Sequence, residues 1–333
     1  MSTETMPSPD LYFDTIFAFQ RSAALKSAID LEVFTAIGDG ARTVKEIAKA
    51  CRVPERGIRI LCDYLTTIGF VTKSGDAYEL TTDSAVFLTK RSPAYLGGTS
   101  AFLGSPDVAG YLERLTQTIR SGTVEESLVA GDNPAWVQFA RAMLPMMMPS
   151  AQAIADILDT ASAGPMRVLD LAAGHGIFGI VLAQRNPNAE IVAVDWGPVL
   201  EVATENAKAM GVGARHRALA GDAFKVDYGS GFDVALVTNF LHHFDWQTNV
   251  AFLKKVAGAL KSGGRVVVLE FVPNEDRVTP PMAARFSLMM LAGTASGDAY
   301  TFRELRGMLT EAGLKDVTAH PLQGPQTVLI ATK

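Results

Sequence analysis

Cysteine is scarce in this sequence, with only Cys51 and Cys62 among 333 residues. Two thiols cannot build a disulfide scaffold, so we expect a reducing compartment and two small packing residues. Long apolar runs are missing too, because no stretch approaches the ~20 residues of a membrane-spanning helix. The N-terminus, MSTETMPSPD, carries acid and proline where a signal peptide needs basic charge and an apolar run. These absences predict a cytoplasmic protein without membrane association.

An excess of basic charge is also lacking. The 30 lysines and arginines stand against 35 acidic residues, which leaves a net charge of −5. A polyanion such as nucleic acid is therefore an unfavourable partner for the chain as a whole. Apolar residues make up 48% and charged residues 20% of the sequence, a balance typical of globular proteins, and the length suits two domains.

The first hundred residues have the order helix, short helix, helix and hairpin. The apolar spacing, a Thr-x-x-Glu capping box and a Gly-centred turn predict these elements. They are helices over Leu11–Ile37, Val44–Ala50 and 54–69, and strands over Phe70–Thr72 and Ala77–Leu80. This order is that of a winged helix. The third helix is strongly apolar and the chain is acidic, so dimerisation is favoured over DNA binding.

Residues 91–160 are predicted to be helical and apolar. Trp136–Leu158 stands out because four methionines lie close together in it. Pro145 and Pro149 fall inside this segment, and proline removes a helical hydrogen bond, so we expect a kink or a break there. Met143 and Met147 are either core residues or part of an apolar, adaptable acceptor pocket.

Residues 165–333 alternate between strand and helix, which is typical of a parallel sheet covered on both faces. The final two strands are joined by a short turn, so the sheet is expected to end with one antiparallel strand. In chain order the predicted strands cover Arg167–Leu171, Glu190–Asp195, His216–Ala220, Asp233–Thr238, Arg265–Phe271, Lys315–His320 and Thr327–Thr332.

A glycine-rich turn follows the first of these strands. Gly174, Gly176 and Gly179 fit G-x-G-x-x-G, a weak dinucleotide fingerprint that lets the backbone approach a ligand closely. Asp195 ends the next strand about 20 residues later, where a carboxylate can accept from two ribose hydroxyls. Both NAD enzymes and methyltransferases need such a group, so this pattern alone leaves both classes open.

Three features discriminate between these classes. Asp170 precedes the glycines, where a carboxylate repels a pyrophosphate but suits the cationic amino group of a methionine moiety. After the third strand, Asp222 can accept a hydrogen bond from an adenine amino group, and Phe224 can pack against the adenine ring. Asn239 begins a Leu-His-His-containing segment at the carboxyl end of the fourth strand, where open α/β sheets bind ligands. The Tyr-x-x-x-Lys pair of short-chain dehydrogenases is absent from the sequence.

With these motifs, the chain resembles class I S-adenosylmethionine-dependent methyltransferases of the O-methyltransferase family, which includes plant phenolic and bacterial polyketide enzymes. The resemblance covers nearly the whole chain. It implies a Rossmann-like seven-stranded α/β sheet with a reversed last strand, a winged-helix-like N-terminal dimerisation domain and a homodimer. On this basis we expect dimerisation through 1–100, a helical linker and substrate lid over 101–160, and the methyltransferase domain over 161–333.

The resemblance also assigns a cofactor site for S-adenosylmethionine. Two positions that are often glycine in the family are alanine here, so the loop is expected to be slightly stiffer. The expected cofactor-binding residues are Asp170, Ala172, Gly174, Gly176, Asp195, Trp196, Gly221, Asp222, Ala223, Phe224 and Asn239.

The family's catalytic histidine falls on His242 and its partner carboxylate on Glu270. A second acid of the plant members falls on Ala299 or is displaced to Asp298, so the full base arrangement of those enzymes does not carry over. A small, largely apolar acceptor is expected to bind among the side chains of Met143, Met147, His243, Phe286 and Met290.

Several alternatives stay open at this point. His242 either removes a proton or only lines the pocket. A metal site from His242, His243 and Asp245 is disfavoured, because adjacent helical side chains point about 100° apart. Methylation of a keto-acid or aromatic carbon is the first alternative to O-methylation. An NAD-dependent oxidoreductase and a winged-helix DNA-binding regulator are further alternatives.

Overall fold

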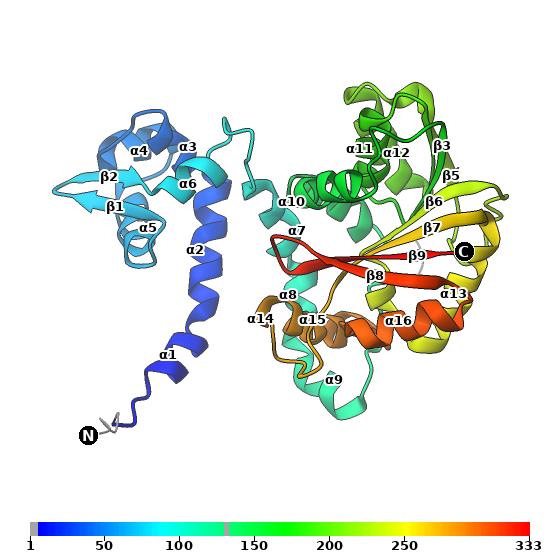
Figure 1. Cartoon of the computed structure of the whole chain (residues 1–333). Coiled ribbons are helices and arrows are strands. Elements are labelled where there is room, and N and C mark those ends of the chain that lie inside the picture. The colour runs from blue at the N-terminus through cyan, green and yellow to red at the C-terminus, as the bar shows by residue number, and fades with distance from the viewer. Residues whose placement is uncertain (1–5, 130–132) are drawn as a thin grey trace, which may run out of the picture. The chain divides into compact units, whose positions relative to one another are not determined.

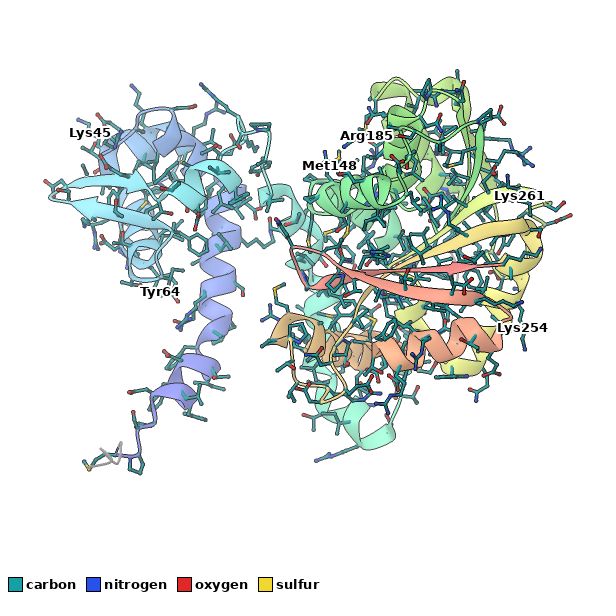
Figure 2. The ribbon with its side chains drawn as sticks, viewed as in Figure 1. Lys45, Tyr64, Met148, Arg185, Lys254 and Lys261 are labelled. Atoms are coloured by element: carbon teal, nitrogen blue, oxygen red, sulfur yellow. The ribbon has the colours of Figure 1, made fainter. Side chains whose placement is uncertain are left out.

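The computed structural model describes residues 6–129 and 133–333, and the chain divides into two compact units, Met1–Ser105 and Pro106–Lys333. Figure 1 shows both units. Charged side chains project from the outer faces of their helices, as Lys254 does in the C-terminal unit (Figure 2). No helix among the described residues is both long and apolar enough to span a membrane.

The N-terminal unit is mainly helical and contains one two-stranded hairpin, as the sequence predicts. Its core includes Phe34, Ile47, Ile58, Leu65 and Tyr78, all essentially inaccessible to solvent. The elements are α1 (Asp10–Ile16), α2 (Ala18–Asp30), α3 (Val33–Gly38), α4 (Val44–Cys51), α5 (Glu55–Thr67), β1 (Val71–Ser74), β2 (Ala77–Leu80), α6 (Thr82–Phe87), η1 (Gly97–Thr99) and α7 (Ser100–Leu103).

Local sequence signals explain the boundaries of two of these helices. The predicted capping box is present at the start of α4, where Thr43 and Glu46 each accept the other's backbone N–H. The prediction of one continuous helix over Leu11–Ile37 is wrong, because the segment forms three helices. Glu32 adopts a left-handed backbone with φ 59°, which ends α2 and redirects the chain into α3. A spacing of apolar residues does not reveal one such residue.

The C-terminal unit begins with three helices, α8 (Pro106–Glu113), α9 (Leu115–Ser121) and α10 (Ala135–Ile157). Of the kink or break expected at Pro145 and Pro149, the break does not occur, because both prolines lie inside one helix of 23 residues. Proline in a helix interior costs roughly 3 kcal/mol. Here burial of Met143, Met147 and other apolar side chains of α10, which packs on two helices of the sheet domain, offsets that cost.

The remaining chain forms a seven-stranded sheet with the order β5-β4-β3-β6-β7-β9-β8. The strands are β3 (Met166–Leu171), β4 (Ala189–Asp195), β5 (His216–Ala220), β6 (Phe232–Thr238), β7 (Leu260–Phe271), β8 (Lys315–Pro321) and β9 (Gln326–Thr332). All neighbours from β5 to β7 pair in parallel, whereas β9 is antiparallel to both β7 and β8. The reversed last strand is thus confirmed.

Helices cover both faces of this sheet (Figure 1). α11 and α12 pack together on one face, and α13 and α16 pack together on the other. The helices after β3 are α11 (Ile177–Arg185), α12 (Gly197–Ala209), η2 (Gly213–Arg215), η3 (Leu241–His243), α13 (Trp246–Ala259), α14 (Pro281–Ala284), α15 (Phe286–Gly293) and α16 (Phe302–Glu311).

The carboxyl ends of the five parallel strands share one edge of the sheet. Because β9 runs in the opposite direction, its first residue lies at this same edge, where Gln326 pairs with Phe271 at the end of β7. Side chains from β3, β4, β6, β7 and β9 therefore meet at one edge, which is where ligands bind in sheets of this kind.

Candidate active site

The turn from β3 to α11 bends sharply at three residues. Ala172, Gly174 and Gly176 all have left-handed backbones, with φ of 50°, 57° and 74°. Glycine adopts this conformation without strain, whereas alanine does not, which fits the expectation of a stiffer loop at Ala172. Gly179 is required for another reason, since a Cβ there would lie 2.8 Å from Asp170 Oδ2.

Asp170 lies at the end of β3 and is completely buried. Its Oδ2 accepts the backbone N–H of Gly179 at 3.1 Å, but Oδ1 has no partner among the described residues. Burial raises the pKa of Asp170 to about 8, and the neighbouring Asp195 adds to that effect. A buried acceptor without a donor is unfavourable by about 1–3 kcal/mol, so this oxygen suits a cationic ligand group such as an ammonium.

Asp195, at the end of β4, ties the glycine loop to the sheet. Its Oδ2 accepts from Gly174 N at 2.8 Å and its Oδ1 from Trp196 N at 2.7 Å. Burial raises the pKa of Asp195 to about 6, although the two backbone donors act to lower it. A carboxylate oxygen has a second lone pair, so both oxygens can still accept from ribose hydroxyls.

The segment after β5 forms an aromatic wall. Asp222 Oδ1 accepts from Phe224 N at 2.9 Å, and its carboxylate also pairs with Lys225 at 3.1 Å. Phe224 contacts the rings of Phe240, Phe244 and Phe252 at centroid distances of 4.9–5.8 Å. Gly221 N donates to the carbonyl of Asp195. This hydrogen bond joins the segment from Gly221 to Phe224, which includes Ala223, to the end of β4.

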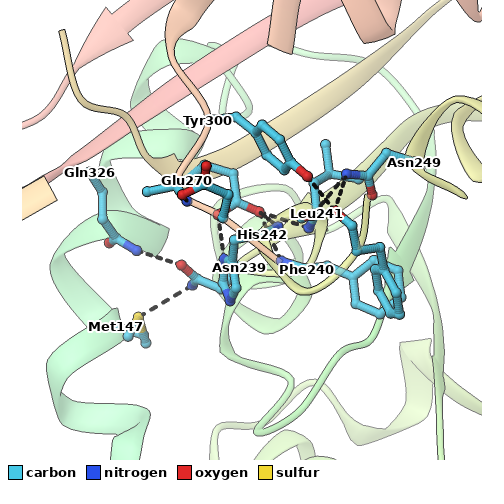
Figure 3. Close-up of polar contacts among 12 residues, drawn as sticks. Met147, Asn239, Phe240, Leu241, His242, Asn249, Glu270, Tyr300 and Gln326 are labelled. Carbon is cyan, nitrogen blue, oxygen red and sulfur yellow. Dashed lines mark hydrogen bonds and ion pairs between the residues drawn. The ribbon is translucent and has the colours of Figure 1, made fainter. Parts of the chain in front are cut away.

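A buried histidine–carboxylate pair stands between the ends of β6 and β7 (Figure 3). His242 lies in the one-turn helix η3 after β6, and Glu270 is the penultimate residue of β7. Nδ1 of His242 lies 2.5 Å from Glu270 Oε2, and the two side chains are 5% and 3% exposed. No described residue hydrogen-bonds the other ring nitrogen, Nε2, which leaves it available to a ligand.

Glu270 also shapes the loop that carries His242. Its Oε1 accepts from the backbone N–H groups of Phe240 and Leu241 at 3.0 and 2.8 Å. A buried carboxylate is stable only when it is hydrogen-bonded or paired. Glu270 meets this requirement by capping η3 with one oxygen and holding the imidazole with the other.

The second acid of the plant members has no counterpart beside His242. Ala299 is buried, and the carboxylate of Asp298 pairs with Arg277 at 3.2 Å. Asp298 contributes through its backbone instead, because its N–H donates to the carbonyl of His242 at 3.0 Å. The described residues therefore provide His242 with a single carboxylate partner.

Apolar and aromatic side chains surround His242. The Phe286 ring lies 4.9 Å from the His242 ring, centroid to centroid, in an edge-to-face arrangement and stacks on Phe271. His243 packs against His242 and Trp136. Burial, and to a lesser extent the neighbouring His242, holds the pKa of His243 well below its usual value. Its Nδ1 is buried and without a partner among the described residues.

The predicted methionines divide into two groups. Met147 is brought to the site, because its sulfur accepts from Asn239 Nδ2 at 3.6 Å. Met143 and Met290 are buried on α10 and α15, but among the described residues no polar or ring contact joins them to the rest of the site. Met143 lies one helical turn before Met147 and so on the same face of α10.

Sequence reasoning missed several polar residues of the site. Gln326 donates to Asn239 Oδ1, Asn249 donates to two carbonyls of the His242 loop, and Tyr300 donates to Phe244 O. Trp196, which was predicted, is half-buried and packs on Val199 and Ala140. A single polar residue at the start of an apolar strand was the one signal for Gln326.

Comparison with known families gives this arrangement a context. The model of the O-methyltransferase domain matches residues 129–315, and the model of the O-methyltransferase dimerisation domain matches residues 13–90. The chain belongs to the O-methyltransferase family. The predicted class, an S-adenosylmethionine-dependent methyltransferase with this fold, is thereby confirmed, and the family membership argues against the oxidoreductase and DNA-regulator alternatives.

Individual relatives of this chain differ in the atom that they methylate. The 3-hydroxy-5-methyl-1-naphthoate 3-O-methyltransferase of Streptomyces sahachiroi is 27% identical, over 93% of this chain and 90% of its own. An L-tyrosine C(3)-methyltransferase of Streptomyces lavendulae is 26% identical, over 93% of this chain and 88% of its own. A solved structure from Nostoc punctiforme, described as a candidate O-methyltransferase, is 49% identical with a TM-score of 0.95 and covers 99% of this chain and 100% of its own.

Proposed function

We propose that this chain methylates a hydroxyl oxygen of a small, largely apolar acceptor, with His242 as the general base. The observation that carries the proposal is the buried His242–Glu270 pair, with Nδ1 and Oε2 separated by 2.5 Å. It lies at the end of β6, directly beside β3, whose glycine loop would hold the cofactor.

The residues of the glycine loop fit S-adenosylmethionine. Oδ1 of Asp170 would accept from the ammonium of its methionine moiety, and Asp195 would accept from its ribose hydroxyls. Ala172, Gly174 and Gly176 would line the same site. Trp196 and the Gly221–Phe224 segment, including Asp222 and Ala223, would flank the adenine. When bound, this cofactor supplies a methyl group already activated by a positively charged sulfur.

The described side chains position the acceptor and accept its proton. Glu270 accepts the Nδ1–H of His242, which fixes the tautomer with a lone pair on Nε2. Nε2 can then remove the proton from an acceptor hydroxyl, and the carboxylate stabilises the resulting imidazolium. The acceptor pocket would be formed by Phe286, Met147 and His243, with Met143 one turn before Met147 on α10 and Met290 one turn after Phe286 on α15. A base of this kind contributes roughly 10²–10⁴ in rate.

The test compares His242→Ala with wild-type protein. We expect turnover of a hydroxynaphthoate to fall by roughly 10²-fold or more, and binding of S-adenosylhomocysteine, measured by calorimetry, to stay within twofold. His320→Ala, on the edge strand β8, is the matched control and keeps full activity. A His242→Ala enzyme with wild-type turnover would show that positioning alone drives the reaction.

A second candidate is methylation of an aromatic carbon. It is favoured by the relative that methylates tyrosine at carbon, and the same lone pair on His242 would accept the proton lost from the ring. The two candidates predict different products, because an O-methyl and a C-methyl group have distinct carbon chemical shifts. NMR of the product after transfer of a ¹³C-labelled methyl group decides between them.

We further propose that the protein is a homodimer formed through its N-terminal unit. The family model for the dimerisation domain matches this region. The first two helices also leave large apolar side chains in solvent, including Leu11 at 79% and Phe19 at 68% exposure. Exposed apolar surface on this scale indicates a protein interface.

A further inference from the structure

Three polar side chains form a chain of hydrogen bonds, and Figure 3 shows the part of it that joins Gln326, Asn239 and Met147. Ser150 of α10 donates from Oγ to Gln326 Oε1 at 2.9 Å. Gln326, the first residue of β9, donates from Nε2 to Asn239 Oδ1 at 2.6 Å. Asn239 follows β6 and donates from Nδ2 to the Met147 sulfur at 3.6 Å. We call Ser150, Gln326 and Asn239 the amide relay.

The direction of every bond in the amide relay is fixed by Met147. A thioether sulfur has no hydrogen to donate, so the NH₂ end of Asn239 must face it. Oδ1 of Asn239 then faces Gln326, which must present its own NH₂ group. Gln326 Oε1 is left to accept from Ser150. The amide relay therefore presents N–H groups, and not an oxygen, at the Asn239 end.

This donor end is underused within the protein. Nδ2 carries two hydrogens, and across 6–129 and 133–333 its single partner is the sulfur, a weak acceptor. Gln326, the middle member of the amide relay, is only 7% exposed, whereas Ser150 and Asn239 at its two ends are half-buried. An oxygen atom of a ligand would replace the weak N–H···S contact with a stronger hydrogen bond.

The strand order places this donor on the acceptor side of the site. Asp170 and Asp195, the candidate cofactor carboxylates, end β3 and β4, whereas Asn239 follows β6 and turns toward β9. β7 and β9 lie on the opposite side of β6 from β3 and β4. Asn239 N also donates to Leu269 O, the residue before Glu270, so Asn239 follows β6 at the level where β7 carries Glu270.

We infer that Asn239, oriented by Gln326 and Ser150, donates a hydrogen bond to a second oxygen of the acceptor. The acceptor is then a hydroxy-arene that also bears a carbonyl or carboxylate oxygen, and this inference rests on the proposed function. It moves Asn239 from the cofactor site, where the sequence motif placed it, to acceptor recognition. Gln326 and Ser150 are positioning residues in this scheme.

The experiment measures binding of three arenes to protein saturated with S-adenosylhomocysteine, by calorimetry. 2-Naphthol bears a hydroxyl alone, whereas 3-hydroxy-2-naphthoate and 6-hydroxy-2-naphthoate add a carboxylate at two spacings. We expect wild-type protein to bind at least one naphthoate about tenfold or more tightly than the naphthol. Absence of any preference, or of any binding of the three arenes, overturns the inference.

Two nearly isosteric variants test the relay itself. Asn239→Asp tolerates the left-handed backbone of this position, φ 53°, but replaces the donor with a carboxylate and should abolish the preference. Gln326→Glu has no donor for Asn239 Oδ1, so the Asn239 amide turns its NH₂ inward and the preference is again lost. Gln323→Glu, an exposed glutamine three residues earlier, is the control and retains it.

The outcomes separate this inference from the proposed function. A preference that survives both relay variants overturns the inference. So does a tenfold loss of S-adenosylhomocysteine affinity in Asn239→Asp with the preference intact, because Asn239 would then serve the cofactor. Failure of wild-type protein to bind S-adenosylhomocysteine at all would instead refute the proposed function.

Discussion

Glu270 has two separate tasks, one for each carboxylate oxygen. Oε1 accepts backbone N–H groups of the η3 loop, while Oε2 holds Nδ1 of His242. The plant-type second acid is missing, so the orientation and tautomer of His242 depend on one side chain. A carboxylate that caps a loop and orients its histidine links the fold of the loop to the chemistry proposed for it.

Glu270→Gln should reduce turnover almost as strongly as His242→Ala, by roughly 10²-fold or more. The backbone donors keep the glutamine Oε1 where Oε1 of Glu270 is, so the NH₂ group must face His242. Nδ1 then becomes the acceptor, the proton moves to Nε2, and the base is lost. Steady-state kinetics with Glu311→Gln as a surface control checks this, and a turnover within threefold of wild type would contradict it.

Asp170 should make the unliganded protein less stable as pH rises toward 8. Burial raises its pKa to about 8, against about 3.9 in an unfolded chain. Between these values the folded protein keeps a proton that the unfolded chain has released, so the free energy of unfolding falls by up to about 1.4 kcal/mol per pH unit. Asp195 contributes in the same direction up to about pH 6.

The useful window for this measurement is pH 6.5–8. Burial lowers the pKa of His175, His216 and His243, so these groups affect stability only below about 6.5, where the unfolded imidazole takes up a proton. Denaturant titrations of wild type should show the fall across the window, and Asp170→Asn should flatten it. An unchanged slope in Asp170→Asn would show that the buried carboxyl is not its source.

At the scale of elements, the spacing of apolar residues and the positions of turn residues predicted most of the sheet domain. Every strand from Arg167 onward was located to within a few residues, because buried parallel strands are apolar runs between glycine and polar turns. Of the kink or break expected at the two prolines of α10, the break does not occur, because tertiary packing outweighs the local effect of proline. The one helix expected over Leu11–Ile37 was wrong, and at the break between α2 and α3 the cause is Glu32, a single left-handed residue that leaves no periodic trace.

The candidate site was predictable only where its residues follow strands in recognisable motifs. Asp170, Asp195, His242 and Glu270 were found in this way. Gln326 was not, because it comes from an antiparallel strand whose first residue reaches the site only through its pairing with β7. Contacts that depend on strand order are invisible to motif spacing.

The loop between α15 and α16 is a supporting element for His242. Gly297 lies so close to it that a Cβ would stand 2.6 Å from Thr294 Oγ1 and would overlap the carbonyl oxygen of His242. Gly297→Ala should therefore displace the loop, lower the free energy of unfolding by about 1–3 kcal/mol and reduce turnover.

Gly258→Ala is the matched control for this change. Gly258 lies in α13 with no atom near its missing Cβ, so alanine should stabilise the protein by about 0.5–1 kcal/mol. Thermal denaturation of both variants gives the comparison. Equal melting temperatures for the two would mean that the loop is not held against His242.

At the scale of the whole molecule, the described residues of the proposed active site all lie in the C-terminal unit. The N-terminal unit supplies none of the proposed catalytic or cofactor residues, yet it has a complete core of its own. The apolar surface of α1 and α2 lies outside that core, and the residues between Asp10 and Phe19 are all exposed. A unit that has a buried core of its own and a large exposed apolar face is suited to forming a dimer through that face.

Light scattering at micromolar concentration should therefore give twice the mass of the 35.6 kDa chain. The double variant Leu11→Glu and Phe19→Glu should be monomeric, because each substitution places a charge in an apolar contact. Val278→Glu, which changes a side chain of 65% exposure in the C-terminal unit, is the control and should remain dimeric. A monomeric wild-type protein, or a double variant that stays dimeric, would mean that α1 and α2 do not form the interface. Because the core of the N-terminal unit begins after these side chains, the monomeric variant should still fold, and this separates loss of assembly from loss of structure.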